Sequence, residues 1–362
     1  MKNFFYILLY TVLIFFITDF FFGKTILDNL YENGIILSDD KRKAKLERIQ
    51  KKEKKYRIKN KIYHHTLKQN IKTQSIWGGN KYLTCTDKFG FRNFCDKIDN
   101  QNKNIILIGD SFTEGIGLEY KKTFSGMFAK KMDLRVMNMG VSSYSPVIYK
   151  NKIKYYLDNY NFKINHVIVF LDMSDIIDEA FYYIECDKVV CDRIVKKNTP
   201  ISNFKKEKTR FPILEFIKVS VKNIKRKIKP KVYIYRKDFT RSNWTFVKET
   251  KEIKIGIQNS VLHMNELYKY LDKKNISLTI AVYPYPGQLL YDQENSKQVK
   301  IWKDFCKNKC KYFINYFPSF FGEIKNSNNK RIIDKYYIKN DVHFNFDGNK
   351  KIFEKLNNLK FQ

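Results

Sequence analysis

The sequence predicts an α/β protein, a parallel sheet covered by helices on both faces, preceded by one N-terminal transmembrane helix. Three observations support this prediction. Short, nearly continuous apolar runs recur through the larger, second part of the chain, as in strands that are buried on both faces. Longer amphipathic runs separate them, and this alternation is typical of βαβ units. The chain also begins with an apolar segment long enough to cross a bilayer.

The N-terminal apolar segment is NFFYILLYTVLIFFITDFFFG, residues 3–23. As a helix rising ~1.5 Å per residue, it matches the ~30 Å hydrocarbon layer of a membrane. Bulky residues follow it, so it lacks the small-residue cleavage site of a removed signal peptide, and residues 1–23 are predicted to be an uncleaved signal anchor. Asp19 lies near the outer end of the span, where interfacial water can reach it.

Two further regions follow the anchor. Residues 24–78 are polar and rich in lysine, most densely at 41–61, and are predicted to form a basic linker or stalk. The folded domain is predicted over residues 79–362. It includes an insertion at about 180–250 that is rich in lysine and aromatic residues.

Within the domain the apolar runs predict strands and the amphipathic runs predict helices. The strands are NIILIG (104–109), LRVMNMG (134–140), HVIVFLD (166–172), SLTIAVYP (277–284) and KYFINYF (311–317). The helices are YKKTFSGMFAKKM (120–132), PVIYKNKIKYYLDNY (146–160), IGIQNSVLHMNELYKYLDKKN (255–275) and FDGNKKIFEKLNNL (346–359). In open parallel sheets, ligands bind at the carboxyl ends of the strands, and Ser111 falls at one such end.

The chain is strongly basic, with 69 lysine and arginine residues against 37 acidic ones and a net charge of +32. Such an excess favours anionic surroundings, such as lipid headgroups or acidic glycans. Lysine is spread along the whole chain, however, and no nucleic-acid-binding motif accompanies it. We therefore expect a membrane association through the N-terminal helix and no nucleic-acid partner.

The six cysteines fall into three local pairs: Cys85 with Cys95, Cys186 with Cys191, and Cys306 with Cys310. Local pairs suit disulfides in an oxidising compartment, with free thiols or zinc as the alternatives. None of the pairs has the Cys-x-x-Cys spacing. The basic stretch after the anchor favours a cytoplasmic domain by the positive-inside rule, whereas the cysteines favour the opposite side. We expect a single-pass membrane protein with three disulfides and an extracytoplasmic domain, periplasmic or on the cell surface.

Three stretches supply candidate catalytic residues at or near strand ends. In GDSFTEG, Ser111 follows the first strand directly; in NMGVSSYSP, Gly140 follows the second. Near the C-terminus, DVHFN supplies Asp341 and His343, two positions apart. In an extended segment such residues project to the same side, so the aspartate can orient the imidazole toward the serine.

A fourth stretch, LDMSDIIDEA, ends the third strand and carries Asp172 and Ser174. In this order and spacing the four stretches resemble the blocks of the SGNH, or GDSL-like, hydrolase superfamily, over roughly residues 80–360. DKFGFR, AVYPYPGQ and the helix around Trp302 are similar to a bacterial, membrane-anchored branch. The resemblance implies a flavodoxin-like three-layer α/β/α fold with a Ser–His–Asp triad. It also implies ester hydrolysis or O-acyl transfer through an acyl-serine intermediate, with no metal or organic cofactor.

Carried over by position, Ser111 would be the nucleophile, His343 the general base and Asp341 the residue that orients the base. The backbone N–H groups of Ser111 and Gly140 would form the oxyanion hole, joined by Ser174. Each preorganised donor of this kind is worth ~3 kcal/mol of barrier.

The sequence departs from the superfamily pattern at two places. The third block normally reads G-x-N-D, but this chain has DMSD at 172–175, with Ser174 in place of the asparagine. The acid precedes His343 by two positions rather than three. The D-x-H spacing also occurs in polysaccharide O-acetyltransferase relatives of the superfamily, which keeps acyl transfer open.

Tyr144, Trp244 and Arg241 are predicted to bind substrate, because aromatic faces bind sugars and cations hold anionic groups. The sequence thus predicts a serine ester hydrolase or O-acyltransferase, such as an acetyltransferase, acting on an envelope glycan or glycolipid. The alternative is a catalytically degenerate domain of this type that binds an anionic envelope polymer through its basic surface.

Overall fold

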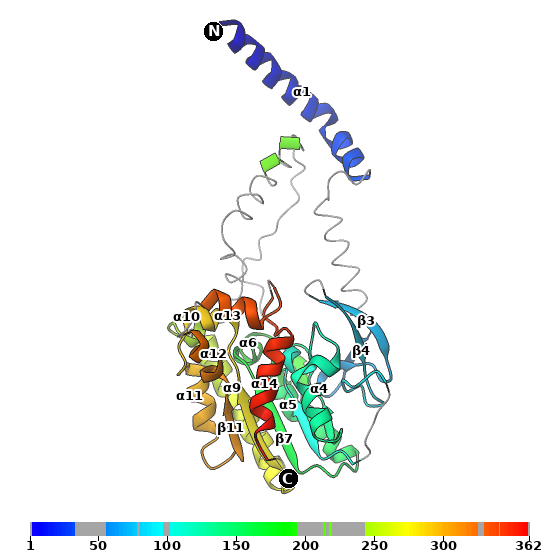
Figure 1. Cartoon of the computed structure of the whole chain (residues 1–362), viewed down its shortest axis with the longest axis vertical. Helices are drawn as coiled ribbons and strands as arrows, with labels where there is room; N and C mark the ends of the chain where they lie inside the picture. Colours follow the sequence, from blue (N-terminus) through cyan, green and yellow to red (C-terminus); the bar gives the residue numbers. More distant parts are fainter. Residues whose placement is uncertain are drawn as a thin grey trace. The chain divides into compact units, whose positions relative to one another are not determined.

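The computed structural model describes most of the chain (Figure 1). The chain divides into two compact units. One unit contains residues 1–51 and 196–233, and the other contains residues 52–195 and 234–362. The residues described are 2–32, 56–77, 80–96, 102–193, 211, 213–214, 217–218, 243–324, 329–339 and 341–360. The larger unit, called the body below, carries the predicted domain.

The body is built on a five-stranded parallel sheet with the strand order β11-β10-β7-β5-β6. Its strands are β5 (Ile105–Ile108), β6 (Val136–Asn138), β7 (His166–Leu171), β10 (Ser277–Val282) and β11 (Tyr312–Asn315). Every residue of β5 and β7 is buried. Because successive side chains of a strand point to opposite faces, the sheet is covered on both. The strand order is that of flavodoxin-like folds, whose topological switch point lies between the first and third strands, here β5 and β7.

Two groups of helices cover the sheet. Among them, α9 (Lys251–Asp272) packs on both α5 (Pro146–Asn159) and α6 (Met173–Phe181), whereas α4 (Phe124–Lys131) packs on α14 (Phe346–Asn357). Right-handed crossovers place the connections β6-α5-β7 and β5-α4-β6 on opposite faces of the sheet. The remaining α-helices of the body are α3 (Ser111–Glu114), α10 (Pro286–Tyr291), α11 (Lys297–Phe305), α12 (Phe317–Ile324) and α13 (Asn329–Tyr336). The predicted three-layer α/β/α class is confirmed.

The body begins earlier than the predicted boundary at residue 79. Two hairpins precede that point or cross it: β1 (Arg57–Asn60) with β2 (His64–Leu67), and β3 (Lys72–Trp77) with β4 (Asn80–Cys85). Tyr56, Tyr63 and Leu67 are buried in the main core. The boundary at 79 therefore falls inside a hairpin, and residues 56–77 belong to the body rather than to a stalk.

Two of the three predicted disulfides are present, Cys85–Cys95 and Cys306–Cys310. The prediction for Cys186 and Cys191 is wrong, since both are free thiols. They lie on the hairpin of β8 (Tyr183–Cys186) and β9 (Val189–Asp192), where they are not directly opposite each other. The two thiols are close to each other, and a hydrogen bond with Cys186 raises the pKa of Cys191 to about 11.

The other unit contains the N-terminal helix α1 (Lys2–Glu32). Its segment Asn3–Ile26 has a mean hydropathy of 2.1 and is long and apolar enough to cross a membrane. Most of its apolar side chains are exposed, as expected of side chains that would contact lipid.

Candidate active site

Ser111 lies on a sharp turn from strand β5 into helix α3, at the switch point of the sheet. Asp110 caps the helix, its carboxylate accepting the N–H of the residue after the serine at 3.0 Å. Gly109 allows the close approach of the turn to β7. A Cβ atom there would lie 2.2 Å from the hydroxyl oxygen of Thr113 and 2.9 Å from the carbonyl oxygen of Phe170.

The structure brings the three predicted catalytic residues together. The Oγ atom of Ser111 lies 2.8 Å from Nε2 of His343. Nδ1 of the same ring lies 2.5 Å from Oδ1 of Asp341, which also accepts the backbone N–H of His343 at 3.0 Å. One carboxylate oxygen thus fixes both the ring and the backbone of the histidine, so the two-residue spacing gives a working geometry.

Asp341 is held in place by a residue that the sequence motifs did not indicate. Trp77, at the end of β3, donates its indole N–H to Oδ2 of Asp341 at 3.0 Å. Its ring meets the ring of His343 edge to face, with centroids 5.4 Å apart. Burial alone would raise the pKa of Asp341, but His343, its backbone N–H and Trp77 together hold that pKa below its ordinary value. The acid is therefore kept ionised.

A second contact from the N-terminal hairpins supports the helix after the nucleophile. Arg57 of β1 makes a bidentate pair with the buried Glu114 of α3, at 2.7 and 2.8 Å. The same carboxylate accepts the N–H of Ser142 at 2.7 Å, from the loop after β6. Burial would raise the pKa of Glu114, yet Arg57 and Ser142 lower it. Glu114 thus joins the nucleophile helix both to β1, through Arg57, and to the loop that carries Gly140, through Ser142.

Two of the three predicted oxyanion donors are bonded within the protein. The Gly140 N–H donates to Oδ1 of Asn138 at 3.0 Å. The Ser174 hydroxyl donates to Asp172 at 2.6 Å, and Asp172 also accepts the Ser174 N–H. The prediction for these two groups therefore does not match this geometry, whereas the Ser111 N–H has no partner among the residues described. Gly140 has a packing role instead, because a Cβ atom there would lie 2.7 Å from the Cβ of Thr113.

Three buried carboxylates lie beneath the nucleophile, those of Asp110, Asp172 and Asp175. Burial, and next the neighbouring Asp172 carboxylate, raise the pKa of Asp110 and of Asp175 well above the ordinary value. Tyr149 donates to Asp175 at 2.5 Å, and the Tyr283 hydroxyl lies 3.4 Å from both Asp110 and Asp172. The raised pKa values of Asp110 and Asp175 and the tyrosine hydroxyl donors thus favour less negative charge below the serine.

Two of the three side chains predicted to bind substrate are buried in the structure. Trp244 is 1% exposed and donates its indole N–H to the carbonyl of Met173, so it packs in the core and offers no face to a sugar. Tyr144 is fully buried, with its hydroxyl donating to the carbonyl of His65 at 2.5 Å. Both predictions are wrong for these side chains. Arg241 lies outside the described residues.

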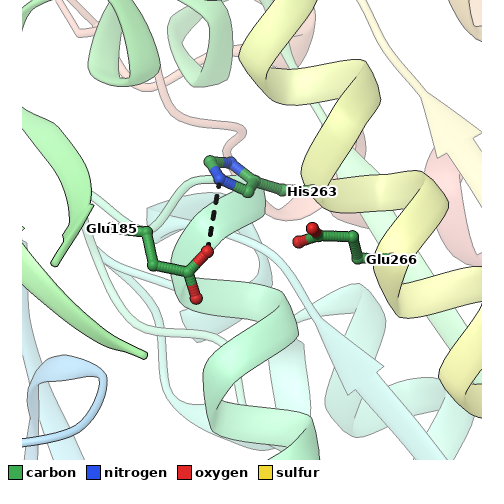
Figure 2. Close-up of side chains that lie close together, drawn as sticks. All are labelled: Glu185, His263 and Glu266. Atoms are coloured by element: carbon green, nitrogen blue, oxygen red, sulfur yellow. Dashed lines mark ion pairs between the residues drawn. The ribbon is translucent and has the colours of Figure 1, made fainter. Parts of the chain in front are cut away.

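Figure 2 shows a second cluster of polar side chains, Glu185, His263 and Glu266, whose donor atoms lie within 4.8 Å of one another. The spacing would suit a metal ion. However, the ammonium of Lys150 bonds Glu185 at 2.6 Å and Glu266 at 2.7 Å, so a cation already lies between the carboxylates. Nδ1 of His263 lies 3.0 Å from a carboxylate oxygen of Glu179. We interpret the cluster as an ion-pair network that joins α5, α9 and the β8–β9 hairpin.

Comparisons with known proteins give structural neighbours. No protein-family model and no curated protein matches the chain. An acetylxylan esterase from Geobacillus stearothermophilus is similar in structure, with a TM-score of 0.39 and 12% identity over 72% of this chain and 94% of its own. A psychrotrophic esterase from Pseudoalteromonas has a TM-score of 0.37 and 13% identity, with coverage of 70% and 95%. A G-D-S-L family lipolytic protein from Desulfitobacterium hafniense has a TM-score of 0.35 and 13% identity, with coverage of 70% and 98%.

The strand order and the nucleophile turn at the switch point agree with what the sequence motifs implied. A serine, a histidine and an aspartate from two distant segments meet above the carboxyl ends of the strands. The flavodoxin-like fold that the sequence motifs implied is confirmed.

Proposed function

We propose that the protein is a serine ester hydrolase that works through an acyl-serine intermediate. The observation that carries this proposal is the continuous line of hydrogen bonds from Asp341 through His343 to the Ser111 hydroxyl, at 2.5 and 2.8 Å. A serine hydroxyl is a weak nucleophile until a neighbouring base takes its proton, and here that base is within reach and oriented.

The chemistry follows from these contacts. Ser111 Oγ attacks the ester carbonyl carbon while its proton passes to Nε2 of His343, and Asp341 stabilises the imidazolium that forms. The Ser111 N–H faces the developing oxyanion. When the tetrahedral intermediate collapses, the bond from carbon to the leaving oxygen breaks and His343 protonates that oxygen. Water, activated by the same histidine, then cleaves the acyl-serine to acid and free serine.

The substrate and location belong to the same proposal. We propose an ester on an envelope glycan or glycolipid, with a sugar hydroxyl able to replace water in the second step, which would make the reaction an acyl transfer. Support for an extracytoplasmic body comes from its two disulfides, which suit an oxidising compartment. Support for a membrane anchor comes from α1, with its exposed apolar surface.

A second candidate is a non-catalytic domain that binds an anionic envelope polymer. The observation in its favour is that the Gly140 N–H and the Ser174 hydroxyl are bonded to Asn138 and Asp172 rather than free for an oxyanion. The net charge of +32 would supply the attraction for such a polymer.

One experiment separates the two candidates. The full chain in detergent is incubated with a serine-directed fluorophosphonate and, separately, with p-nitrophenyl acetate, beside the variants Ser111→Ala and Ser125→Ala. Ser125 is a matched control because it is buried and donates to the Thr113 carbonyl, away from the histidine. We expect labelling and turnover in the wild type and in Ser125→Ala, and neither in Ser111→Ala. A wild type that is neither labelled nor active would favour the binding protein, and equal labelling of Ser111→Ala would exclude Ser111 as the nucleophile.

A further inference from the structure

Asp19 of the anchor helix is fully buried, although most of the described side chains around it on the helix are exposed. The atoms bonded to it come from the insertion, almost two hundred residues further along the chain. Its two carboxylate oxygens accept the backbone N–H groups of Ile213 at 2.7 Å and Leu214 at 2.8 Å. A carboxylate with two backbone N–H donors is the arrangement that caps the start of a helix, and both donors have helical backbone.

Aromatic packing accompanies this cap. The ring of Phe211 meets Phe16 edge to face, with centroids 5.5 Å apart, and lies 5.9 Å from the ring of Phe20. Phe16, Asp19 and Phe20 share one side of α1, as residues three and four positions apart do. The insertion therefore contacts one defined stripe of the anchor. The anchor-contact segment is defined here by its described residues, Phe211, Ile213, Leu214, Ile217 and Lys218.

The depth of this contact can be worked out along the helix. Asp19 lies seven residues before the end of the apolar segment at Ile26, or about 10 Å at 1.5 Å per residue. The apolar segment of 24 residues is about 36 Å long, so a centred ~30 Å hydrocarbon layer would begin about 3 Å inside its end. Asp19 and the two N–H groups bonded to it would then lie about 7 Å below the hydrocarbon boundary.

At that depth each partner needs the other. A carboxylate inside the hydrocarbon layer is costly unless it is hydrogen-bonded, and so is a backbone N–H without an acceptor. The contact satisfies both, while Phe211, Ile213, Leu214 and Ile217 present apolar side chains. Ile217 is 43% exposed, as a side chain facing lipid would be. The stretch at 211–218 is too short to cross the bilayer, and Lys218 would favour a position close to the interface.

We propose that the anchor-contact segment enters the membrane beside α1 and is held there by Asp19, as a second contact of this chain with the lipid bilayer. This inference rests on the membrane anchor given under the proposed function. It gives part of the insertion a lipid-binding role in place of the sugar-binding role predicted from its aromatic residues. It also gives a reason for a carboxylate in an otherwise apolar span.

The test places a tryptophan reporter at Ile217 in the full chain, reconstituted in nanodiscs of phosphatidylcholine and phosphatidylglycerol. Ile217→Trp replaces an exposed side chain, and Phe21→Trp, at a position 68% exposed on α1, reports on the anchor. Fluorescence of the three native tryptophans is subtracted with the wild type. Dibrominated phosphatidylcholine quenches tryptophan in the hydrocarbon layer, and iodide quenches it in water.

We expect bromolipid to remove most of the added emission at both reporter positions, with little quenching by iodide. If Phe21→Trp is quenched by iodide alone, the anchor is not in the bilayer and the membrane location itself fails. If Phe21→Trp is quenched by bromolipid and Ile217→Trp by iodide alone, the anchor stands and the second lipid contact is refuted.

The role of Asp19 is tested in the Ile217→Trp background by Asp19→Ala, with Thr11→Ala as the matched control. Thr11 is another polar residue of α1, and its hydroxyl donates to the carbonyl of Ile7, one turn back in the same helix. We expect Asp19→Ala to abolish most of the bromolipid quenching at 217 and Thr11→Ala to leave it unchanged. Equal quenching in Asp19→Ala and its parent would overturn the cap.

Discussion

Two regions of the body flank Ser111 in the candidate active site, and only one of them is recognisable from its sequence. The C-terminal segment at 341–345 supplies the acid and the base, and its residue types indicate that chemistry directly. The N-terminal hairpins at 57–85 supply Trp77, which holds the acid, and Arg57, which holds the nucleophile helix. Groups that react come from a small set of residue types in short motifs. Groups that position them act through single contacts between distant segments, which no motif records.

The largest effect should come from the segment that reacts. Asp341→Asn should lower kcat by up to about 10⁴-fold, because an amide stabilises the wrong tautomer of His343 and cannot stabilise its charged form. The measurement is the turnover of p-nitrophenyl acetate, with Ser111→Ala as the background. A loss below tenfold would mean that another acid orients the histidine.

The next largest effect should come from the N-terminal hairpins, and it should be on the unfolding free energy of the protein. Arg57→Met leaves the buried carboxylate of Glu114 without its cation, which should cost about 3–5 kcal/mol of unfolding free energy. Denaturant unfolding of the full chain in detergent measures the change. Lys307→Met is the matched control: it removes a solvent-exposed ion pair with Asp304 and should have no measurable effect.

The difference in unfolding free energy between the wild type and Arg57→Met should depend on pH in a predictable direction. In the wild type the folded-state pKa of Glu114 is lowered, so its pairing stabilises the fold above the unfolded pKa of ~4.3, and this stability is lost as the pH falls through the folded value. In Arg57→Met, burial dominates and raises that pKa, so the variant gains stability as the pH falls from 7 toward ~4.3. The difference in unfolding free energy between the wild type and Arg57→Met should therefore become smaller as the pH falls. A difference that becomes larger would contradict the role given to the pair of Arg57 and Glu114.

Trp77→Phe should have a smaller effect on the reaction itself. It removes one hydrogen bond to an ionised carboxylate, a change worth ~1.5–3 kcal/mol, so kcat should fall by at least about tenfold with KM unchanged. Trp302→Phe is the control, because Trp302 is fully buried beside Phe305, away from the triad, and should lower stability without lowering kcat. If Trp77→Phe lowers stability but leaves kcat unchanged, as expected of the control, then Trp77 has only a packing role.

The sequence predicted the α/β class, the five strands of the sheet and the three triad residues, because buried strands and reactive motifs both depend on local residue patterns. The strand at 104–109, for example, is observed as Ile105–Ile108. It did not predict the start of the body, since the hairpins at 57–85 are rich in lysine and polar residues and contribute only Tyr63 and Leu67 to the buried residues of the main core. It also misassigned Trp244, because the residue type alone does not show whether an aromatic side chain in a basic insertion faces a ligand or packs in the core.

Ser174 shows the same limit inside a motif, and its substitution should have the smallest effect. Position alone assigns it to the oxyanion hole, but its hydroxyl donates to Asp172 at 2.6 Å, and Tyr285 donates to its oxygen at 3.3 Å. If that arrangement holds in the transition state, Ser174→Ala removes no oxyanion donor, and kcat should change by less than about threefold. A true oxyanion donor costs about 10²–10³ in kcat when it is removed. A loss of that size, without loss of stability, would show that the hydroxyl turns from Asp172 to the substrate, and the motif would then have assigned this residue better than its contacts do.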